Sequence, residues 1–556
     1  MGHRARAVGA GYDDAENIDG RARWALARCA ARRPAAGALG ARRSLILPAV
    51  AVRRDARQHS APSSVAVIDI GSNSGRISVV EAGTGGHLEI VADARFPLRL
   101  VHESAAEGRL GDAAVTRVAE ALRAFLAIAR SAGAQAVVAV ATAAVRESVN
   151  RREFVGRVAA ETGVKLEILE GALEARYMFA GAIHGLPVDS GLAVDIGGGS
   201  VEICHFRDRR PLRQWTLPLG ALRLSDRFLV TDPPRPSEQS RLRQHALATI
   251  VGAGVPPLRP GEHLVGTGGT LRNLAKVDRA RRTYPISRLH GYQLDRADLD
   301  VAVDTLAARA VVRRRRVRGL SAERADSIVG GALCAQVLLN TLSADQLLLS
   351  GQGLREGVAL ERLGLQVHSA AEVRRSSAEA LARRFTTWDG AQAQLRSSLA
   401  TSLIDKLDPG ASPSMQEMLE HASLLVDIGR SVDYYSRWEH AARIVATSDL
   451  YGFSHRDIVL MSAVLEKAGD DRVTLPGYLS FLGTQDHAQV DRLAMILALA
   501  DELSHRLLPD EQLVVQRRRS GIVVLLPRDV GPLEAETERR FYRRFERRLR
   551  LAVASG

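Results

Sequence analysis

The stretch 67–74 reads Val-Ile-Asp-Ile-Gly-Ser-Asn-Ser, and the stretch 193–200 reads Ala-Val-Asp-Ile-Gly-Gly-Gly-Ser. In each, an apolar strand ends in an aspartate and runs into a turn of glycine and small polar residues, after which a second apolar strand follows. The backbone N–H groups and hydroxyls of such a turn suit a phosphate. An ordinary tight hairpin with a surface carboxylate would explain one copy alone. Two copies predict two related lobes that face each other across a cleft, with a phosphate chain and its metal as the ligand.

A third turn, Val-Gly-Thr-Gly-Gly-Thr at 265–270, follows the two hairpins. The three turns in this order resemble the actin-like ATPase and sugar-kinase superfamily. Within it, further motifs resemble the exopolyphosphatase/guanosine pentaphosphate phosphatase (Ppx/GppA) family. These are Ala-Thr-Ala-Ala-Val-Arg at 141–146, Gly-Ala-Leu-Glu-Ala-Arg at 171–176, Arg-Ala-Asp at 324–326 and Ser-Gly-Gln-Gly-Leu-Arg-Glu-Gly at 350–357. The resemblance covers about residues 64–360 closely and 370–510 more loosely.

The resemblance implies an α/β fold class: two actin-like, ribonuclease H-like ATPase-fold lobes, then an all-α HD-like domain and a small C-terminal α+β unit. We expect a disordered Arg/Ala-rich leader (1–63), lobe I (64–186), lobe II (187–363), the HD-like domain (370–510) and the appended unit (511–556). An intact HD site contains a His-Asp pair, but here Val426 stands before Asp427 in the place of the histidine. A site that lacks such a ligand usually loses its metal, so we predict a structural role for this domain.

Glu174 and Arg146 are the predicted catalytic residues. By position alone, Glu174 is a carboxylate in the first turn of a helix, where it would interact favourably with the helix dipole. The resemblance implies instead that it is the base that aims a water molecule. The family carries two adjacent glutamates here, and this chain replaces the first with Leu173 but keeps the second. Arg146 is expected to clamp a phosphate oxygen bidentately.

Hydrolysis of a phosphoanhydride also needs a metal and donors that hold the phosphoryl oxygens. Asp195 ends its strand, and Ser200 and Glu202 alternate onto one face of the returning strand. Asp195, Glu202 and the corresponding Asp69 of lobe I are therefore the predicted ligands of Mg²⁺ or another divalent cation. The predicted phosphate-binding residues are Ser72, Asn73, Ser74, Gly198, Gly199, Ser200, Gly268 and Thr270.

The composition limits the compartment and class of the protein. The chain has 556 residues, a formal charge of +13 and 46% hydrophobic residues, which is enough for three or more domains. Its three cysteines, Cys29, Cys204 and Cys334, lie far apart. This spacing disfavours a disulfide framework or a zinc site and favours the cytoplasm. No apolar run reaches about 18 residues, so we expect no membrane span.

Charge is concentrated in a few segments. Residues 1–62 contain 12 arginines against five acidic residues, and we favour a disordered extension or an over-long start over a transit peptide. Arginine-rich runs also occur at 313–316, 517–519 and 539–548. They indicate either a solvated helix face or a track for a polyanion, which needs charges but no sequence code. Aromatic residues make up only 4% of the chain, so a base-stacking nucleic-acid surface is not supported.

The resemblance implies an exopolyphosphatase, expected as a homodimer, that releases orthophosphate from the ends of inorganic polyphosphate. Guanosine pentaphosphate 5′-phosphatase activity stays open, because both substrates end in a phosphoanhydride. A kinase of the superfamily would aim its base at a bound hydroxyl, so a base at Glu174 aimed at water favours a phosphatase. A non-catalytic polyanion-binding protein is the remaining alternative.

Overall fold

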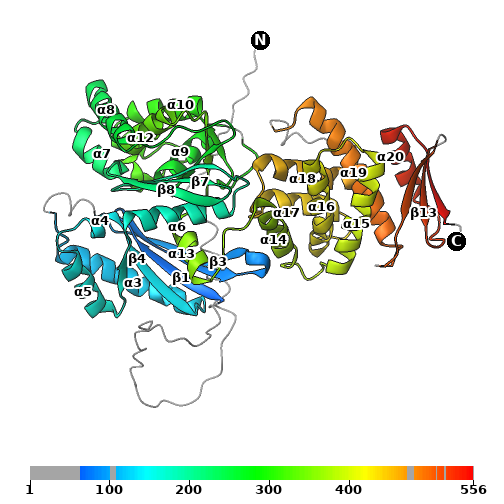
Figure 1. Cartoon of the computed structure of the whole chain (residues 1–556), viewed down its shortest axis with the longest axis horizontal. Helices are drawn as coiled ribbons and strands as arrows, with labels where there is room; N and C mark the ends of the chain where they lie inside the picture. The colour runs from blue at the N-terminus through cyan, green and yellow to red at the C-terminus, as the bar shows by residue number, and fades with distance from the viewer. Residues whose placement is uncertain are drawn as a thin grey trace, which may run out of the picture. The chain divides into compact units, whose positions relative to one another are not determined.

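A computed structural model describes residues 63–100, 108–282, 284–472, 481–508, 510–518 and 521–554. The expectations for the leader and for Cys29 lie outside these residues. Figure 1 shows two α/β lobes, a helical domain and a small terminal sheet. Within the described residues, no helix is both long enough and apolar enough to cross a membrane.

Lobe I is built on a five-stranded sheet in the order β3-β2-β1-β4-β5. Strand β1 is buried on both faces, which is why its sequence is continuously apolar. Ala66 and Ile68 pack in a core with α3 and α5, while Val65 and Val67 pack in a second core with α6 and α13. The elements are β1 (Ser64–Ile70), β2 (Ser74–Ala82), β3 (Leu88–Pro97), α3 (Asp112–Ser131), β4 (Ala136–Ala141), α4 (Ala143–Arg146), α5 (Arg151–Thr162), β5 (Leu166–Ile168), α6 (Gly171–His184) and α13 (Leu354–Arg362).

Lobe II repeats this topology in a six-stranded sheet of order β10-β11-β9-β6-β7-β8. Its strands β8-β7-β6-β9 correspond to β3-β2-β1-β4, since each set is two antiparallel pairs followed by a parallel partner. The prediction of two related lobes is therefore confirmed. The elements are β6 (Gly191–Ile196), β7 (Val201–Arg207), β8 (Arg210–Leu217), α7 (Ala221–Phe228), α8 (Pro236–Gly252), β9 (His263–Thr267), α9 (Gly268–Arg281), β10 (Gln293–Asp295), α10 (Arg296–Ala307), α11 (Val311–Arg314), η2 (Ala322–Arg324), α12 (Ile328–Thr341) and β11 (Gln346–Leu349).

Helix α6 lies between the two sheets. Its Tyr177 packs in a core with strands of lobe I, and its Phe179 and Ile183 pack in a core with strands of lobe II. Helix α13 comes at the end of the segment predicted as lobe II, yet it packs on α6 and on the lobe I sheet. The two helices approach so closely that a Cβ at Gly357 would lie 1.8 Å from the carbonyl oxygen of Tyr177. The beginning of α6, which carries Glu174, is thus held by both lobes.

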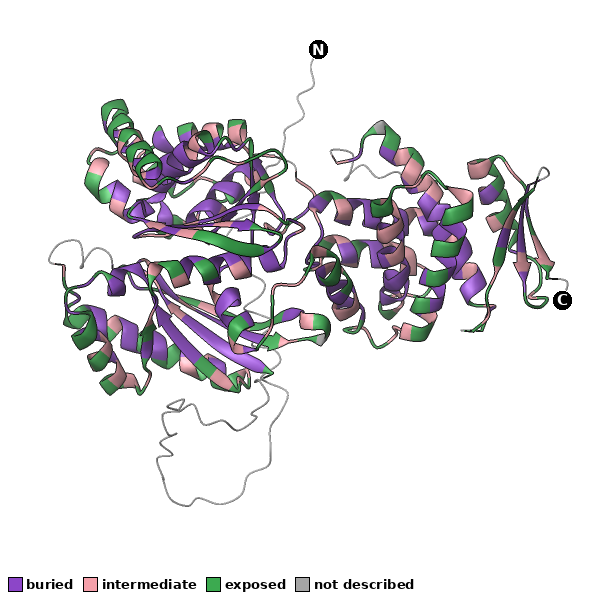
Figure 2. Cartoon of the chain, in the orientation of Figure 1, coloured by how far each residue is buried: buried purple, intermediate pink, exposed green. Residues whose placement is uncertain are grey.

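The chain continues into helices that share one core with the terminal sheet (Figure 2). Val515 and Val524 of the sheet and Phe541 of α20 all belong to this core. The elements are α14 (Ala370–Ala382), α15 (Gly390–Leu407), α16 (Pro413–Leu425), η3 (Val426–Ser431), α17 (Arg437–Thr447), α18 (His455–Gly469), α19 (Thr484–Ser504), β12 (Val514–Arg518), β13 (Gly521–Leu526), α20 (Ala535–Phe545) and β14 (Leu549–Val553). The all-α domain and the small α+β unit match the predicted fold class.

An arginine lies at the centre of the HD-like domain. Arg396 of α15 is fully buried, and its Nη2 donates to Asp427 at 2.7 Å. Its Nε lies 2.6 Å from Asp501, which also pairs with Arg437 at 2.7 Å. Val426, the residue in the place of the family's histidine, is buried in the core. Asp427 of the predicted pair, and Asp501, are thus neutralised by guanidinium groups.

Two buried histidines join lobe II to the helical domain. His455 Nε2 lies 2.9 Å from the carbonyl oxygen of His290, and its Nδ1 lies 2.8 Å from the Tyr284 hydroxyl. His290 Nε2 lies 2.6 Å from the carbonyl oxygen of Gly185, and its Nδ1 accepts from the Gly351 N–H. A carbonyl only accepts, so Nε2 carries the hydrogen in both rings, and His290, whose Nδ1 accepts from a backbone N–H, is neutral. Burial lowers the pKa of both to about 3.

We expect this junction to lose stability in mild acid. A histidine with a pKa of about 3 when folded and 6.5 when unfolded contributes stability above pH 6.5 that is lost as the pH falls. Between pH 7 and pH 5, the free energy of unfolding should fall by about 2 kcal/mol because of His455 alone. Thermal unfolding at both pH values measures this loss. His455→Gln cannot be protonated, so its Tm should fall less than that of the wild type; equal shifts would contradict the assignment.

Candidate active site

A cavity of about 120 Å³ lies where the hairpin turns of both lobes and the first turns of several helices meet. The lobe I turn contributes Gly71, Ser72, Asn73 and Ser74, and the lobe II turn contributes the stretch from Gly197 to Ser200. The other lining residues are Asp69, Arg76, Thr142, Ala143, Glu174, Asp195, Glu202, Gly268, Gly269, Arg272, Arg324, Gly353, Leu354, Arg355 and Glu356. Most predicted site residues are thus brought together.

The two hairpin turns have the same hydrogen bond and face each other. The Gly71 N–H donates to the Ser74 carbonyl at 3.2 Å, and the Gly197 N–H donates to the Ser200 carbonyl at 3.0 Å. A Cβ at Gly199 would lie 3.0 Å from the Ser72 hydroxyl oxygen. The turns are therefore close enough for one phosphate chain to contact both.

The first turn of α9 shapes the floor of the cavity. Gly268 has φ +80°, and a Cβ there would lie 1.8 Å from Asp195 Oδ1. A side chain at this position would displace the carboxylate, so only glycine fits. Thr270 does not line the cavity, because it is fully buried and packs towards Gly331 of α12. The phosphate-binding role predicted for Thr270 therefore has no support from its position.

The predicted metal ligands are three carboxylates at the ends of buried strands. Asp195 and Glu202 lie opposite each other in the β6–β7 register, and Ser200 donates a hydrogen bond to Glu202. Burial raises the pKa of Asp69 to about 6, although Arg355 and Arg76 lower it. Burial also raises the pKa of Asp195 and, with the charge of Glu174, that of Glu202. Burial thus disfavours the charged form of all three carboxylates.

These carboxylates fit a divalent cation in the way Mg²⁺ usually binds. Asp69 Oδ1 is buried without a hydrogen-bond partner among the described residues. The same residues contain no group of three or more His, Cys, Asp or Glu placed to bind a metal by themselves. Mg²⁺ is typically held by one or two carboxylates, with waters and substrate phosphates as its other ligands. These ligands suit a cation that binds together with the substrate phosphates better than one that is coordinated by the protein alone.

Glu174 lies in the first turn of α6, buried but lining the cavity. Arg146, at the end of α4, donates from Nη1 to the Glu174 carboxylate and to the Leu169 carbonyl oxygen at 2.9 Å. Burial raises the pKa of Glu174, and the Arg146 guanidinium opposes this rise. Arg146 does not line the cavity. In this structure its Nη1 orients Glu174, while its Nη2 is buried without a hydrogen-bond partner among the described residues, so the predicted phosphate clamp stays a prediction.

Four further arginines line the cavity, and the sequence analysis assigned none of them a role. They are Arg76, Arg272, Arg324 and Arg355. Burial lowers the pKa of Arg76 and Arg272, and that of Arg324 to about 10. Arg76 lies opposite Asp69 in the β1–β2 register. An arginine in an otherwise apolar strand is the signal that sequence reasoning missed there. Guanidinium groups of this kind hold phosphoryl oxygens through charge-assisted hydrogen bonds.

Ion pairs join the two lobes at two places. Arg95 of β3 pairs with Glu323 of η2, and Arg99 lies 3.4 Å from Asp326. Across the cleft, Arg223 of α7 pairs with Glu147, which follows α4. We call these pairs the lip of the cleft, because Glu323 directly precedes Arg324 and the Arg223 N–H lies 3.3 Å from the Gly198 carbonyl oxygen, and both Arg324 and Gly198 line the cavity.

Comparison with known proteins gives a consistent result. The Ppx/GppA phosphatase family matches residues 79–366, and Ppx/GppA phosphatase domain III matches residues 373–518. Exopolyphosphatase 1 of Mycobacterium leprae is 32% identical over 328 residues, covering 56% of this chain and 92% of the relative. Exopolyphosphatase 1 of Mycobacterium tuberculosis is 32% identical over 315 residues, covering 56% and 91%. The crystal structure of an exopolyphosphatase from Cytophaga hutchinsonii is 25% identical with a TM-score of 0.51, covering 55% of this chain and all of that one.

Proposed function

The chain belongs to the Ppx/GppA phosphatase family, and from this premise we propose that it is an exopolyphosphatase. It would hydrolyse the terminal phosphoanhydride of inorganic polyphosphate and release orthophosphate. The observation that carries the proposal is the placement of Glu174. A buried carboxylate with a raised pKa, oriented by Arg146, lines a cavity between two phosphate-type turns. We also infer a homodimer, as the resemblance implies, and a cytoplasmic location, which the spacing of the cysteines favours.

Each group has a defined task in this reaction. The turn N–H groups and the cavity arginines hold the terminal phosphoryl oxygens. A divalent cation would be held by carboxylates from the set Asp195, Glu202 and Asp69 together with waters and substrate phosphates, and it would neutralise charge at the phosphoryl oxygens. Glu174 accepts a proton from a water whose oxygen bonds to the terminal phosphorus, while the bond to the bridging oxygen breaks. The products are orthophosphate and a chain that is one phosphate shorter.

Guanosine pentaphosphate is the second candidate substrate, because it presents the same terminal group to the same residues. Measuring kcat/KM on long polyphosphate, tripolyphosphate and guanosine pentaphosphate tests the proposal. A preference for polyphosphate is expected. A preference for guanosine pentaphosphate would move the assignment to the alternative. Phosphorylation of an acceptor by ATP, without phosphate release from any of the three, would favour a kinase.

The proposed ligand roles predict an altered cation requirement. Asp195→Asn or Glu202→Gln removes a charged oxygen, so the Mg²⁺ concentration for half-maximal activity should rise by about tenfold or more. Titrating Mg²⁺ at saturating tripolyphosphate measures the shift. Glu147→Gln is a matched control, because this carboxylate lies at the lip and pairs with Arg223. Equal Mg²⁺ curves for the control and the ligand variants would refute the assignment.

A further inference from the structure

The cavity accommodates only the end of a polyphosphate. Its volume of about 120 Å³ is similar to that of an engineered cavity of roughly 150 Å³ that binds one benzene molecule. Long polyphosphate carries about one negative charge per phosphate along its whole length. If the proposed function holds, most of a long substrate lies outside the cavity, on whatever surface of the protein attracts it.

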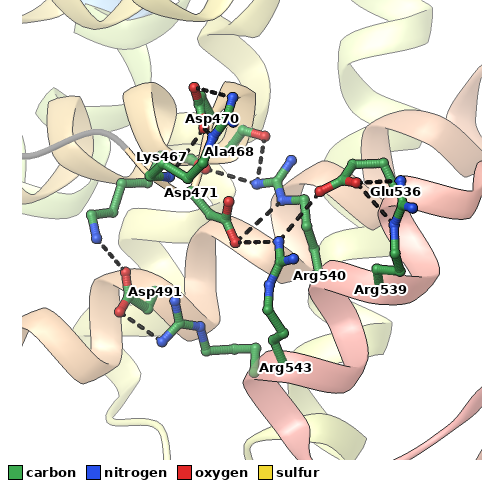
Figure 3. A network of polar contacts seen from close by, with 11 residues as sticks. Lys467, Ala468, Asp470, Asp471, Asp491, Glu536, Arg539, Arg540 and Arg543 are labelled. Carbon is green, nitrogen blue, oxygen red and sulfur yellow. Dashed lines mark hydrogen bonds and ion pairs between the residues drawn. The ribbon is translucent and has the colours of Figure 1, made fainter.

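The structure distinguishes among the arginine runs of the sequence. In the run at 539–548, most arginines are occupied by pairing within the chain, as Figure 3 shows. Arg543 pairs with Asp471 at 3.0 Å, and Arg539 pairs with Glu536 at 2.7 Å. Arg540 Nη2 donates to the carbonyl oxygen of Lys467, near the end of α18, at 2.8 Å. The contacts of Arg540 and Arg543 attach α20 to the helical domain, and that of Arg539 lies within α20, so this run is mainly structural.

The run in lobe II is different. Arg313, Arg315, Arg316 and Arg318 are exposed and form no ion pair with any described residue, whereas Arg314 is buried and lies 3.4 Å from Asp232. No acidic residue occurs between Thr305 and Ala322. We call the four exposed residues the lobe II arginine segment. It is a concentrated positive surface without an internal counter-charge.

This segment lies next to the cavity along the chain. Arg318 is six residues before Arg324, which lines the cavity, so their Cα atoms are at most roughly 22 Å apart. The connection packs on α9, the helix that forms the cavity floor. The Ser321 N–H donates to Asn273 at 2.8 Å, and a Cβ at Gly319 would lie 2.3 Å from the Lys276 carbonyl oxygen. The next residues, Glu323 and Asp326, make the ion pairs at the lip of the cleft.

We propose that the lobe II arginine segment binds the distal part of a long polyphosphate whose terminal phosphate lies in the cavity. The inference rests on the proposed function. In that function, the segment would give the enzyme its preference for long polyphosphate over short chains. Exposed guanidinium groups that follow one another along a chain suit a flexible polyanion with evenly spaced charges and no sequence. Binding would release counterions, so the contribution of the segment should weaken as salt rises.

The test removes the four charges together, in the variant Arg313→Gln/Arg315→Gln/Arg316→Gln/Arg318→Gln. At low salt, KM for long polyphosphate should rise at least about tenfold, while kcat/KM for tripolyphosphate stays unchanged. Affinity for long polyphosphate is also measured directly without Mg²⁺. Four contacts give a log–log salt slope of about −2.8, so the wild type should lose up to about 50-fold more affinity than the variant between 50 and 200 mM salt.

A matched control removes four exposed arginines of the terminal unit: Arg517→Gln/Arg518→Gln/Arg548→Gln/Arg550→Gln. It loses the same charge and should keep the wild-type preference for long chains. The proposal is overturned if the control loses this preference as much as the lobe II variant, or if neither does. It is also overturned if single-stranded RNA of equal charge binds the segment more tightly than polyphosphate. An inactive wild type on tripolyphosphate would instead refute the proposed function, whatever the binding data show.

Discussion

Replacing Glu174 with glutamine is expected to lower kcat on tripolyphosphate by at least about a hundredfold and to leave substrate affinity close to that of the wild type. Glutamine has nearly the same shape as glutamate but cannot accept the proton of the attacking water. The phosphate-binding turns and the cavity arginines are untouched by this change. The loss should therefore appear in kcat and not in KM, as for a group that acts only in the transition state.

Glu170→Gln is the matched control for Glu174→Gln. Glu170 is the exposed residue that directly precedes α6, so both carboxylates are placed to interact with the same helix dipole. If Glu174 were only a dipole partner, the two variants would have similar, small effects on stability and none on turnover. Breaking the buried pair with Arg146 also has a cost, so thermal unfolding must show that Glu174→Gln is folded. Near-normal turnover by a folded Glu174→Gln would refute the catalytic role.

The two lobes and their turns were predictable because the signals are local. A strand that is apolar throughout and ends in an aspartate must be buried on both faces, as β1 is. The chain carries this pattern twice, and two copies of one hairpin imply two copies of one lobe. Because the two lobes are related by pseudo-symmetry, their turns face each other, with Ser72 close to Gly199. The same argument predicts from the sequence alone that Asp69 and Asp195 lie at equivalent strand ends.

Side-chain direction within a helix turn was harder to predict. Gly268, Gly269 and Arg272 of α9 face the cavity, while Thr270 points into the core of lobe II. Successive residues of a helix are about 100° apart, so a motif whose first residues face a ligand also turns one residue away from it. A comparison of sequence motifs alone does not show which residues of this helix turn face the cavity and which face the core. Arg146 illustrates the same limit, since its spacing from Glu174 does not reveal that the two side chains pair.

Contacts between residues far apart in sequence were not predictable. Arg396 precedes Asp427 by 31 residues and Asp501 by 105, and the stretch around it resembles an ordinary helix. The sequence showed the loss of one HD ligand at Val426. A guanidinium between Asp427 and Asp501 could not be predicted, because its position depends on how α15, η3 and α19 pack. This buried arginine is the structural feature of the HD-like domain with the largest expected effect on stability.

Arg396→Met is expected to destabilise the helical domain by about 3–5 kcal/mol. Methionine fills part of the space, but it leaves Asp427 as a buried carboxylate without its main counter-charge and Asp501 with only Arg437 and His505 nearby among the described residues. Removing one partner of a buried ion pair lowers the stability of the protein far more than replacing all the paired residues with well-packed apolar ones. The change lies in the helical domain, so tripolyphosphate turnover by the lobes should fall little at temperatures where that domain is still folded.

Urea unfolding followed by the fluorescence of Trp388 and Trp438, which both lie in this domain, measures the effect. Arg443→Met is the matched control: it breaks an exposed pair with Glu439 and should cost at most about 0.5 kcal/mol. Adding Asp427→Asn and Asp501→Asn to Arg396→Met removes the orphaned charges and should recover part of the lost stability. If Arg396→Met unfolds at the same urea concentration as Arg443→Met, the buried ion pairs do not hold this domain together. Tight, stoichiometric binding of a transition metal by the wild-type domain would show instead that the aspartates are free to act as ligands, which the Arg396 contacts exclude.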